Sequence, residues 1–146
     1  MVSQLEKTHG NKLAKEILDE LGIWSERIPD VPYIHEGGAG TYKKPFDRLI
    51  CCRGIAVEFK YRKGLTFNLK AWKENKRTRH QFMNLKRFAE SNSGLAVLFV
   101  FWKKAKTRNI QRVWMPVQEL EGDKIRFEDM YEYDKLVQVM KKWRIQ

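Results

Sequence analysis

The chain has 146 residues, 42% hydrophobic and 12% aromatic, a composition that argues against disorder and predicts one domain over residues 1–146. Its 29 Lys and Arg against 18 Asp and Glu give a net charge of +11, which is typical of proteins that bind a polyanion such as nucleic acid. No apolar run approaches ~20 residues and the N-terminus lacks the apolar core of a signal peptide, so we expect no membrane association and an intracellular location.

The N-terminal half is predicted to begin with a helix over residues 3–21, because its apolar residues recur at helical spacing and Gly22 follows at the stop position. The pattern then predicts a short strand over 23–29, a Gly- and Pro-rich loop over 30–44, and strands over 46–52 and 55–62 joined by a tight turn at Arg53–Gly54. The adjacent Cys51 and Cys52 are expected to be small buried hydrophobic residues.

The C-terminal half is predicted to contain one strand at the centre of the sheet. Residues 94–102 form a continuous apolar run, which is typical of a strand covered on both faces. Around it the pattern predicts a polar connection over 62–79, a helix over 78–91, a strand over 110–117 and a terminal amphipathic helix over 133–146. This order favours an α/β fold with a central mixed sheet flanked by helices.

Acidic and basic side chains share one face of the strand over residues 55–62. Strand side chains alternate, so Glu58 and Lys60 point to the same face, opposite Val57 and Phe59. The hairpin allows Asp47 to come level with Glu58, and two neighbouring carboxylates repel unless a cation lies between them. Hard oxygen ligands suit Mg²⁺, with Mn²⁺ as a substitute. The alternative is an exposed strand face with a Glu58–Lys60 ion pair worth ~0–1 kcal/mol.

These residues resemble the signature of the PD-(D/E)xK nucleases, in the form Asp47…Glu58-Phe59-Lys60. The proline is displaced by one position, since the sequence has Pro45-Phe46-Asp47. The resemblance implies a restriction-endonuclease-like fold and a metal-dependent phosphodiesterase. It also implies that Asp47, Glu58 and the backbone carbonyl of Phe59 hold Mg²⁺ while Lys60 attends the attacking water.

The segment 79–102 resembles the corresponding part of Holliday-junction resolvases of the RecU and archaeal types, in which a His-Gln pair opens a helix before a glycine and an apolar strand. Here the pair is His80-Gln81, and Gln81 either holds a catalytic water or merely packs at the helix start. Those nucleases also carry an acid on the first helix. Glu6 is the candidate, because Gly10, Leu13 and Ile17 continue its stripe, and its alternative role is a capping box with Ser3.

Basic residues flank the proposed site on both sides. Eight of the twenty residues from Lys60 to Arg79 are basic and one is acidic. Contacts to the phosphate backbone give affinity without base preference, and the candidates for them are Lys43, Lys44, Arg62, Lys63 and Arg79. The segment Gly37–Gly40 is predicted to be a mobile loop at the rim of the cleft. Of Tyr61, Phe67 and Trp72, at least two are expected in the core rather than against DNA bases.

The leading hypothesis is a Mg²⁺-dependent endodeoxyribonuclease that resolves four-way DNA junctions as a homodimer, encoded by a cell or a phage. A C₂ dimer would place two sites on opposing strands of a near-symmetric junction. The first alternative is a nicking, repair or restriction-type endonuclease acting on duplex DNA. The second is a basic DNA-binding protein without catalysis.

Overall fold

The computed structural model describes residues 4–23, 25–28, 31–35, 38–42, 46–50, 54–91, 94–104 and 108–145. In chain order the elements are α1 (Gln4–Leu21), β1 (Ser25–Arg27), β2 (Val31–His35), β3 (Gly38–Tyr42), β4 (Arg48–Ile50), β5 (Ile55–Lys63), β6 (Thr66–Asn68), α2 (Leu69–Glu74), α3 (Arg79–Ser91), β7 (Leu95–Lys103), β8 (Ile110–Pro116), η1 (Val117–Glu119), β9 (Lys124–Arg126), η2 (Phe127–Asp129), β10 (Tyr131–Glu132) and α4 (Tyr133–Ile145). None of the helices in these ranges is long and apolar enough to cross a membrane.

The predicted central mixed sheet is confirmed and has six strands in the order β1-β4-β5-β7-β8-β10. Strands β5 and β7 run parallel over nine residue pairs, and the other neighbours are antiparallel. The apolar run predicted to be central forms β7, which lies between β5 and β8 and is buried along nearly its whole length. A parallel pair needs a crossover connection, and α3 lies in the segment that provides it.

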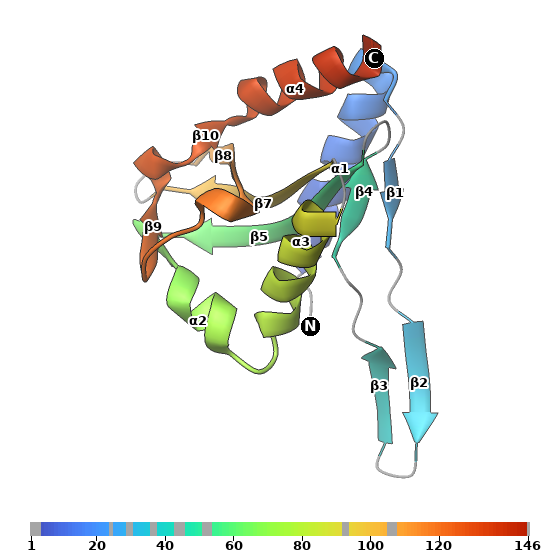
Figure 1. Cartoon of the computed structure of the whole chain (residues 1–146), viewed down its shortest axis with the longest axis vertical. Coiled ribbons are helices and arrows are strands. Elements are labelled where there is room, and N and C mark those ends of the chain that lie inside the picture. Colours follow the sequence, from blue (N-terminus) through green and yellow to red (C-terminus); the bar gives the residue numbers. More distant parts are fainter. Residues whose placement is uncertain are drawn as a thin grey trace.

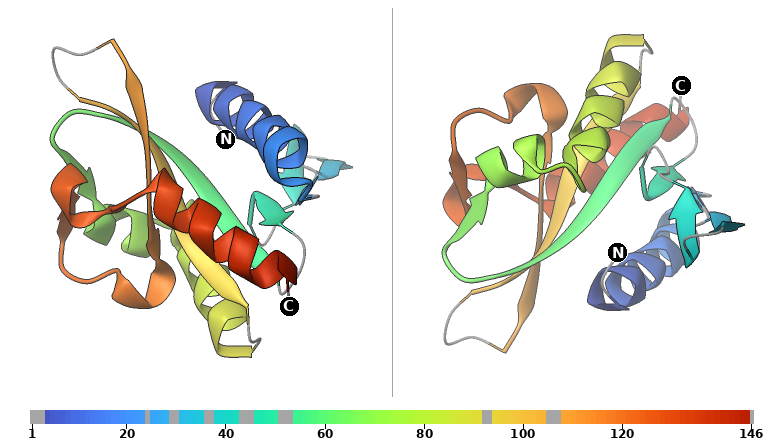
Figure 2. Two further views of the ribbon diagram at one scale, coloured as in Figure 1. Left: turned by 90° about the horizontal axis from the view of Figure 1, so that it is seen from above. Right: turned by 90° about the horizontal axis from the view of Figure 1, so that it is seen from below.

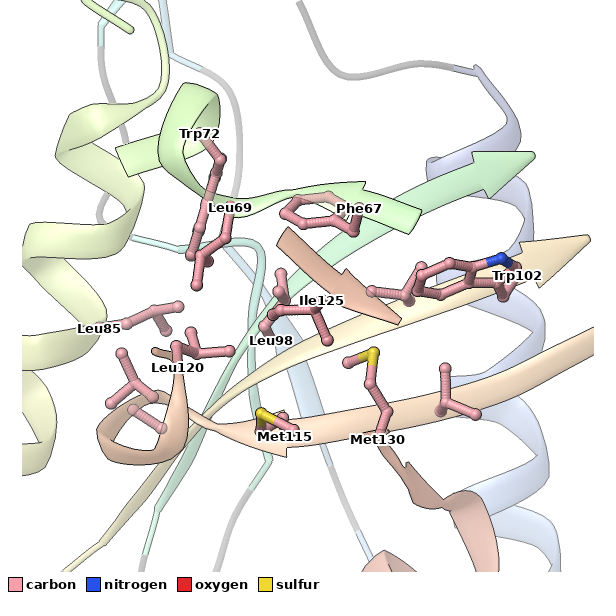
Figure 3. Packing of buried hydrophobic residues seen from close by; sticks show 14 of the residues in the cluster. Phe67, Leu69, Trp72, Leu85, Leu98, Trp102, Met115, Leu120, Ile125 and Met130 are labelled. Carbon is pink, nitrogen blue, oxygen red and sulfur yellow. The ribbon is translucent and has the colours of Figure 1, made fainter. Parts of the chain in front are cut away.

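Helices cover both faces of this sheet, as the two views in Figure 2 show. Helices α1 and α4 cover the face that carries Val57, Phe59 and Phe99, where they contribute Leu13, Ile17, Leu136 and Met140 to one apolar cluster. Helices α2 and α3 cover the opposite face. Their cluster, shown in part in Figure 3, includes Trp72, Leu85, Leu98 and Trp102. Alternate residues of β5 and β7 therefore enter different cores, as the predicted period of two requires.

The predicted loop over residues 30–44 needs correction. The segment 30–44, predicted as a loop, contains the antiparallel pair β2–β3, which extends away from the rest of the molecule in Figure 1. Gly38 and Gly40 lie in β3, so the predicted mobile loop is wrong for the described residues, while Gly37 lies outside them. Glycine has low strand propensity, and the pattern therefore concealed this strand.

The turn between β4 and β5 is longer than predicted. Ile50 pairs with Ile55, so four residues, 51–54, separate the paired positions instead of two. Gly54 has a φ of +89°, a left-handed conformation that favours glycine. Cys51, Cys52 and Arg53 lie outside the described residues. Because the register differs by two positions, each side chain keeps the face that the alternation predicted.

The connection over residues 62–79 has more structure than its polar composition predicted. It contains β6, which pairs with β9, and the short helix α2. The side chain of Asn68 caps α2 by accepting a hydrogen bond from the backbone N–H of Ala71 over 3.0 Å. Phe67 and Trp72 are buried in the core, which confirms that these two aromatic residues serve packing.

Candidate active site

Asp47 lies where the chain enters β4 and closes the end of the β4–β5 ladder. Its backbone N–H donates to the carbonyl of Val57 over 3.1 Å, and its Oδ2 accepts from the backbone N–H of Phe59 over 2.8 Å. The ladder ends with the pairing of Arg48 with Val57, so Asp47 lies beside the part of β5 that carries Glu58. The side chain is 6% exposed. Two hydrogen bonds thus fix Asp47 at the start of β4.

Glu58 lies beside it on β5 and is 2% exposed. Burial raises the pKa of the Glu58 carboxyl well above its usual value, and the negative charge of Asp47 and a hydrogen bond with the Asp47 side chain raise it further. Lys60 acts in the opposite direction, and Glu6 adds a smaller raising effect. Burial and a neighbouring carboxyl favour the protonated form, whereas a cation bound by the pair favours the ionised form. The alternative of an exposed strand face is therefore wrong.

Glu6 lies near the carboxyl pair but belongs to α1, which packs on the opposite face of the sheet. It lies in the first turn of α1, one turn before Gly10, and the predicted stripe through Gly10, Leu13 and Ile17 is buried. Helix α1 packs closely on β5, since a Cβ on Gly10 would lie 3.0 Å from two ring carbons of Phe59. The absence of a side chain at position 10 lets the first turn of α1 come near the carboxyl pair. Ser3, the predicted capping partner, lies outside the described residues.

A small cavity of about 20 Å³, enough for one water-sized group, lies between α1 and the ends of β1 and β4. Its lining combines acids and bases: Glu6, Lys7, Arg27, Asp47 and Arg48, together with Gly10, Asn11 and Phe59. Among these, Lys7, Arg27 and Arg48 were not predicted as site residues. Arg48 is 7% exposed and donates hydrogen bonds to Ser25 Oγ and Asn11 Oδ1. An arginine directly after Asp47 in a short strand was the one available signal.

Phe59 and Lys60 complete the edge next to Asp47. The N–H and C=O of one strand residue point to the same edge of that strand. Because the N–H of Phe59 points to Asp47, its carbonyl faces the same side, beyond the end of β4. Lys60 is half-buried and shares its face with Glu58. The candidate metal ligands here are the carboxylates of Asp47 and Glu58 and the carbonyl of Phe59. All three supply oxygen, the ligand atom that Mg²⁺ prefers.

Asp47 and Glu58 form a pair of carboxyl groups, and they do not form a complete metal site made of protein ligands alone. Within the parts of the chain that the structure describes, no three His, Cys, Asp or Glu side chains are grouped closely enough to enclose a metal ion. Asp47 and Glu58 are in direct contact, whereas Glu6 acts on Glu58 through its charge. Two protein carboxylates plus waters are a usual ligand set for Mg²⁺, which gives up its waters reluctantly. The donor set therefore fits this ion.

Gln81 has a structural contact that the sequence did not reveal. It lies in the first turn of α3, and its Oε1 accepts a hydrogen bond from the indole N–H of Trp72 over 2.8 Å. Trp72 is 4% exposed, so its N–H needs this acceptor. The amide nitrogen of Gln81 remains the group that could contact a water. Packing and water binding are thus compatible in one side chain.

The predicted DNA-binding residues are placed in part. Arg62, Lys63 and Arg79 are exposed, the first two at the end of β5 and the third at the start of α3. Lys43 and Lys44 lie outside the described residues. Tyr61 is half-buried and its ring stacks with that of His9. Two exposed cations thus continue along β5 from the carboxyl pair.

No protein-family model and no curated protein sequence matches this chain. A solved structure is similar to it, that of Hjc, a Holliday junction resolvase from the archaeal hyperthermophile Archaeoglobus fulgidus. The match has a TM-score of 0.58 at 19% sequence identity and covers 92% of this chain and 97% of Hjc. The chain has the fold of this resolvase.

This match confirms the predicted restriction-endonuclease-like α/β fold. At 19% identity the likeness to Hjc concerns the fold alone, so the chemistry must be inferred from the residues of this chain. Those residues are the buried carboxyl pair Asp47 and Glu58, with Lys60 beside it.

Proposed function

We propose that this protein is a Mg²⁺-dependent endodeoxyribonuclease that resolves four-way DNA junctions by paired nicks. The observation that carries the proposal is the buried contact between Asp47 and Glu58. Burying two carboxyl groups together is costly, and a structural role is served more cheaply by apolar side chains. A pair of this kind next to a lysine is a candidate active site.

In the proposed site Asp47, Glu58 and the carbonyl of Phe59 hold Mg²⁺, and Mn²⁺ substitutes for it. When bound, the ion supplies positive charge for the phosphodiester and lowers the pKa of a water. Glu58 would bind the ion as a carboxylate, a form that Lys60 favours because it lowers the pKa of Glu58. The Lys60 ammonium donates to the attacking water or to a phosphoryl oxygen. Glu6 and Gln81 orient groups around this water.

The substrate in this proposal is branched DNA, supported by the likeness in fold to the resolvase Hjc and by the charge of +11. Arg62, Lys63 and Arg79 are exposed for contact with phosphates, and Lys43 and Lys44 are proposed to join them. We also propose that the single nuclease domain acts as a homodimer, because two opposed nicks need two sites related by a two-fold axis. The carboxyl pair itself would also serve a nicking, repair or restriction-type endonuclease acting on duplex DNA.

One assay separates these possibilities. A radiolabelled four-way junction and a linear duplex of the same sequences are incubated with the protein, with Mg²⁺ or with EDTA. The proposal predicts paired nicks in the junction with Mg²⁺ alone and little cleavage of the duplex. Equal cleavage of both would identify a duplex endonuclease, and binding without cleavage would identify a non-catalytic DNA-binding protein. Light scattering of the purified protein tests the dimer.

A further inference from the structure

The turn between β5 and β6 presents an apolar side chain at its tip. Leu65 is 74% exposed, which makes it the most exposed of the large apolar side chains in the described residues. Single exposed leucines are common on protein surfaces, so exposure alone carries no argument. The conformation of this turn and the residues around it point to a function instead.

Three hydrogen bonds hold the turn rigidly. The backbone N–H of Gly64 donates to the carbonyl of Lys103 over 3.2 Å, and the indole N–H of Trp102 donates to the carbonyl of Gly64 over 2.7 Å. Arg62 Nε donates to the carbonyl of Thr66 over 2.5 Å and so spans the turn from one side to the other. Gly64 has a φ of +127°, which favours glycine. Trp102 is fully buried, as Figure 3 shows it among the core residues, so Leu65 is anchored to the core.

Five cations lie on the segments next to this turn. Arg62 and Lys63 precede it on β5, and Lys103 pairs with Lys63 on β7. Arg126 pairs with Thr66 on β9, and Lys104 lies over the ring of Phe127 at 4.4 Å. The acids within three positions of Arg126 are Asp123, Glu128 and Asp129, of which Asp129 accepts from the backbone N–H of Arg126. An apolar tip on a turn whose neighbouring segments carry these five cations does not suit an apolar protein partner, because the cations would be desolvated.

We propose that this turn is the element that recognises the branch point of DNA, with Leu65 inserted between bases that are unpaired or weakly stacked. An apolar wedge among cations that bind phosphates is a known way for proteins to open a base step. The inference rests on the proposed function and names the contact through which the site distinguishes branched DNA from duplex. Base pairs at a branch are more easily unstacked than those inside a duplex, so the cost of insertion is lower there.

The turn directly follows β5, the strand that carries Glu58 of the carboxyl pair. Lys63 lies five positions after Glu58 on β5, which is about 17 Å of extended chain. B-form DNA rises about 3.4 Å per base pair, so the end of β5, where the turn begins, lies about five base-pair steps from Glu58 of the proposed metal site. Lys60, Arg62 and Lys63 lie between them along the strand. The strand thus fixes the distance from branch point to cleaved phosphate.

The test compares Leu65→Ala with a matched control, Leu18→Ala, which removes another exposed leucine from the far part of α1. A four-way junction carries 2-aminopurine at the branch point, and EDTA prevents cleavage. We expect wild-type protein and Leu18→Ala to raise the fluorescence as the base unstacks, and Leu65→Ala to lose this rise. We also expect Leu65→Ala to bind junction about tenfold more weakly with duplex affinity unchanged, whereas Leu65→Phe keeps the preference.

Equal fluorescence and equal junction preference for Leu65→Ala and wild type would overturn the inference, as would a wild-type protein that binds the junction without any rise. A Mg²⁺ arm keeps the two proposals apart. If wild type cleaves junctions while Leu65→Ala behaves identically, only the role of Leu65 is wrong. If wild type cleaves no DNA, the nuclease proposal is wrong, and this inference, which rests on it, is overturned as well.

Discussion

The carboxylate of Asp47 accepts a hydrogen bond from the backbone N–H of Phe59 over 2.8 Å. At this position of an uninterrupted ladder a backbone carbonyl of the neighbouring strand would be the acceptor. Asp47 therefore ends the pairing of β4 with β5, and at the same time its side chain forms a hydrogen bond with Glu58. The hydrogen bond between Asp47 and Phe59 thus explains both where the β4–β5 pairing ends and where the carboxyl pair lies.

Asp47→Asn should separate the fold from the chemistry at this position. The amide oxygen of asparagine still accepts from the Phe59 N–H, so the free energy of unfolding should change by less than about 1.5 kcal/mol. Loss of a charged ligand should lower Mg²⁺-dependent cleavage by at least about 100-fold. Urea unfolding and single-turnover cleavage measure the two effects. Junction binding in EDTA should be retained, and a wild-type rate would contradict the proposed site.

Glu58→Gln should change the pH dependence of stability in the metal-free protein. A carboxyl whose pKa is raised by folding stabilises the native state fully below its unfolded pKa of 4.5 and loses this contribution as the pH rises through the folded pKa. Glutamine does not titrate. The variant should therefore be more stable than wild type near pH 8, by about 1.4 kcal/mol for each unit of the shift. The difference should shrink towards pH 4.5, as urea unfolding in EDTA would show.

Added Mg²⁺ provides the control for this measurement. The ion should raise the stability of the wild-type protein near pH 8 by mass action, because only the folded chain presents the paired carboxyls. It should leave Glu58→Gln almost unchanged. A difference between the two proteins that does not vary with pH would show that Glu58 is charged in the folded state, against its burial beside Asp47.

Lys60→Met should affect both the rate and its pH dependence. Loss of the ammonium should lower the rate at saturating Mg²⁺ by about 100-fold, since one charged donor to the reacting group is lost. Lys60 also lowers the pKa of Glu58, so its removal should move the acid limb of the pH–rate profile to higher pH. Lys60→Arg keeps the charge and should leave that limb in place. A profile that is unchanged in Lys60→Met would show that the ammonium does not act on Glu58.

Substitutions can separate the role of the Gln81 amide oxygen from that of its amide nitrogen. Gln81→Ala leaves the Trp72 indole N–H without its acceptor and should cost about 1–3 kcal/mol of stability. Gln81→Glu restores an acceptor oxygen and should recover this loss, but it removes the amide N–H groups. If the amide contacts the water as proposed, cleavage by Gln81→Glu should fall about tenfold or more at full stability. A wild-type rate in Gln81→Glu would assign Gln81 to packing alone.

Gly10→Ala should act on the site without acting strongly on the fold. Alanine favours the helix by about 1 kcal/mol, but its Cβ would lie 3.0 Å from the Phe59 ring and move α1 outward. Glu6 should then move away from the carboxyl pair, and the rate should fall several-fold at nearly unchanged melting temperature. Lys15→Ala, at an exposed position of the same helix, is the control and should cleave at the wild-type rate.

The sequence predicted the placement of Glu58 and Lys60 on one strand face better than it predicted the surrounding loops. The alternation along β5 decided that Glu58 and Lys60 share a face, and a two-residue change of register left that face unchanged. The β2–β3 pair was missed because glycines in β3 carry no strand signal, and α2 was missed because its lysines looked like a solvated connection. Arg48 was missed because burial of a charge depends on partners, here Ser25 and Asn11, that are distant in sequence.

Glu6 lies in the first turn of α1, where helices are least protected against opening. A ligand that draws this carboxylate towards Asp47 and Glu58 would also have to order that turn, so part of its binding energy would be used for local folding. Hydrogen exchange of the amides in the first turn of α1 should therefore slow when Mg²⁺ is added, and the affinity for the ion should rise under any condition that favours helix formation.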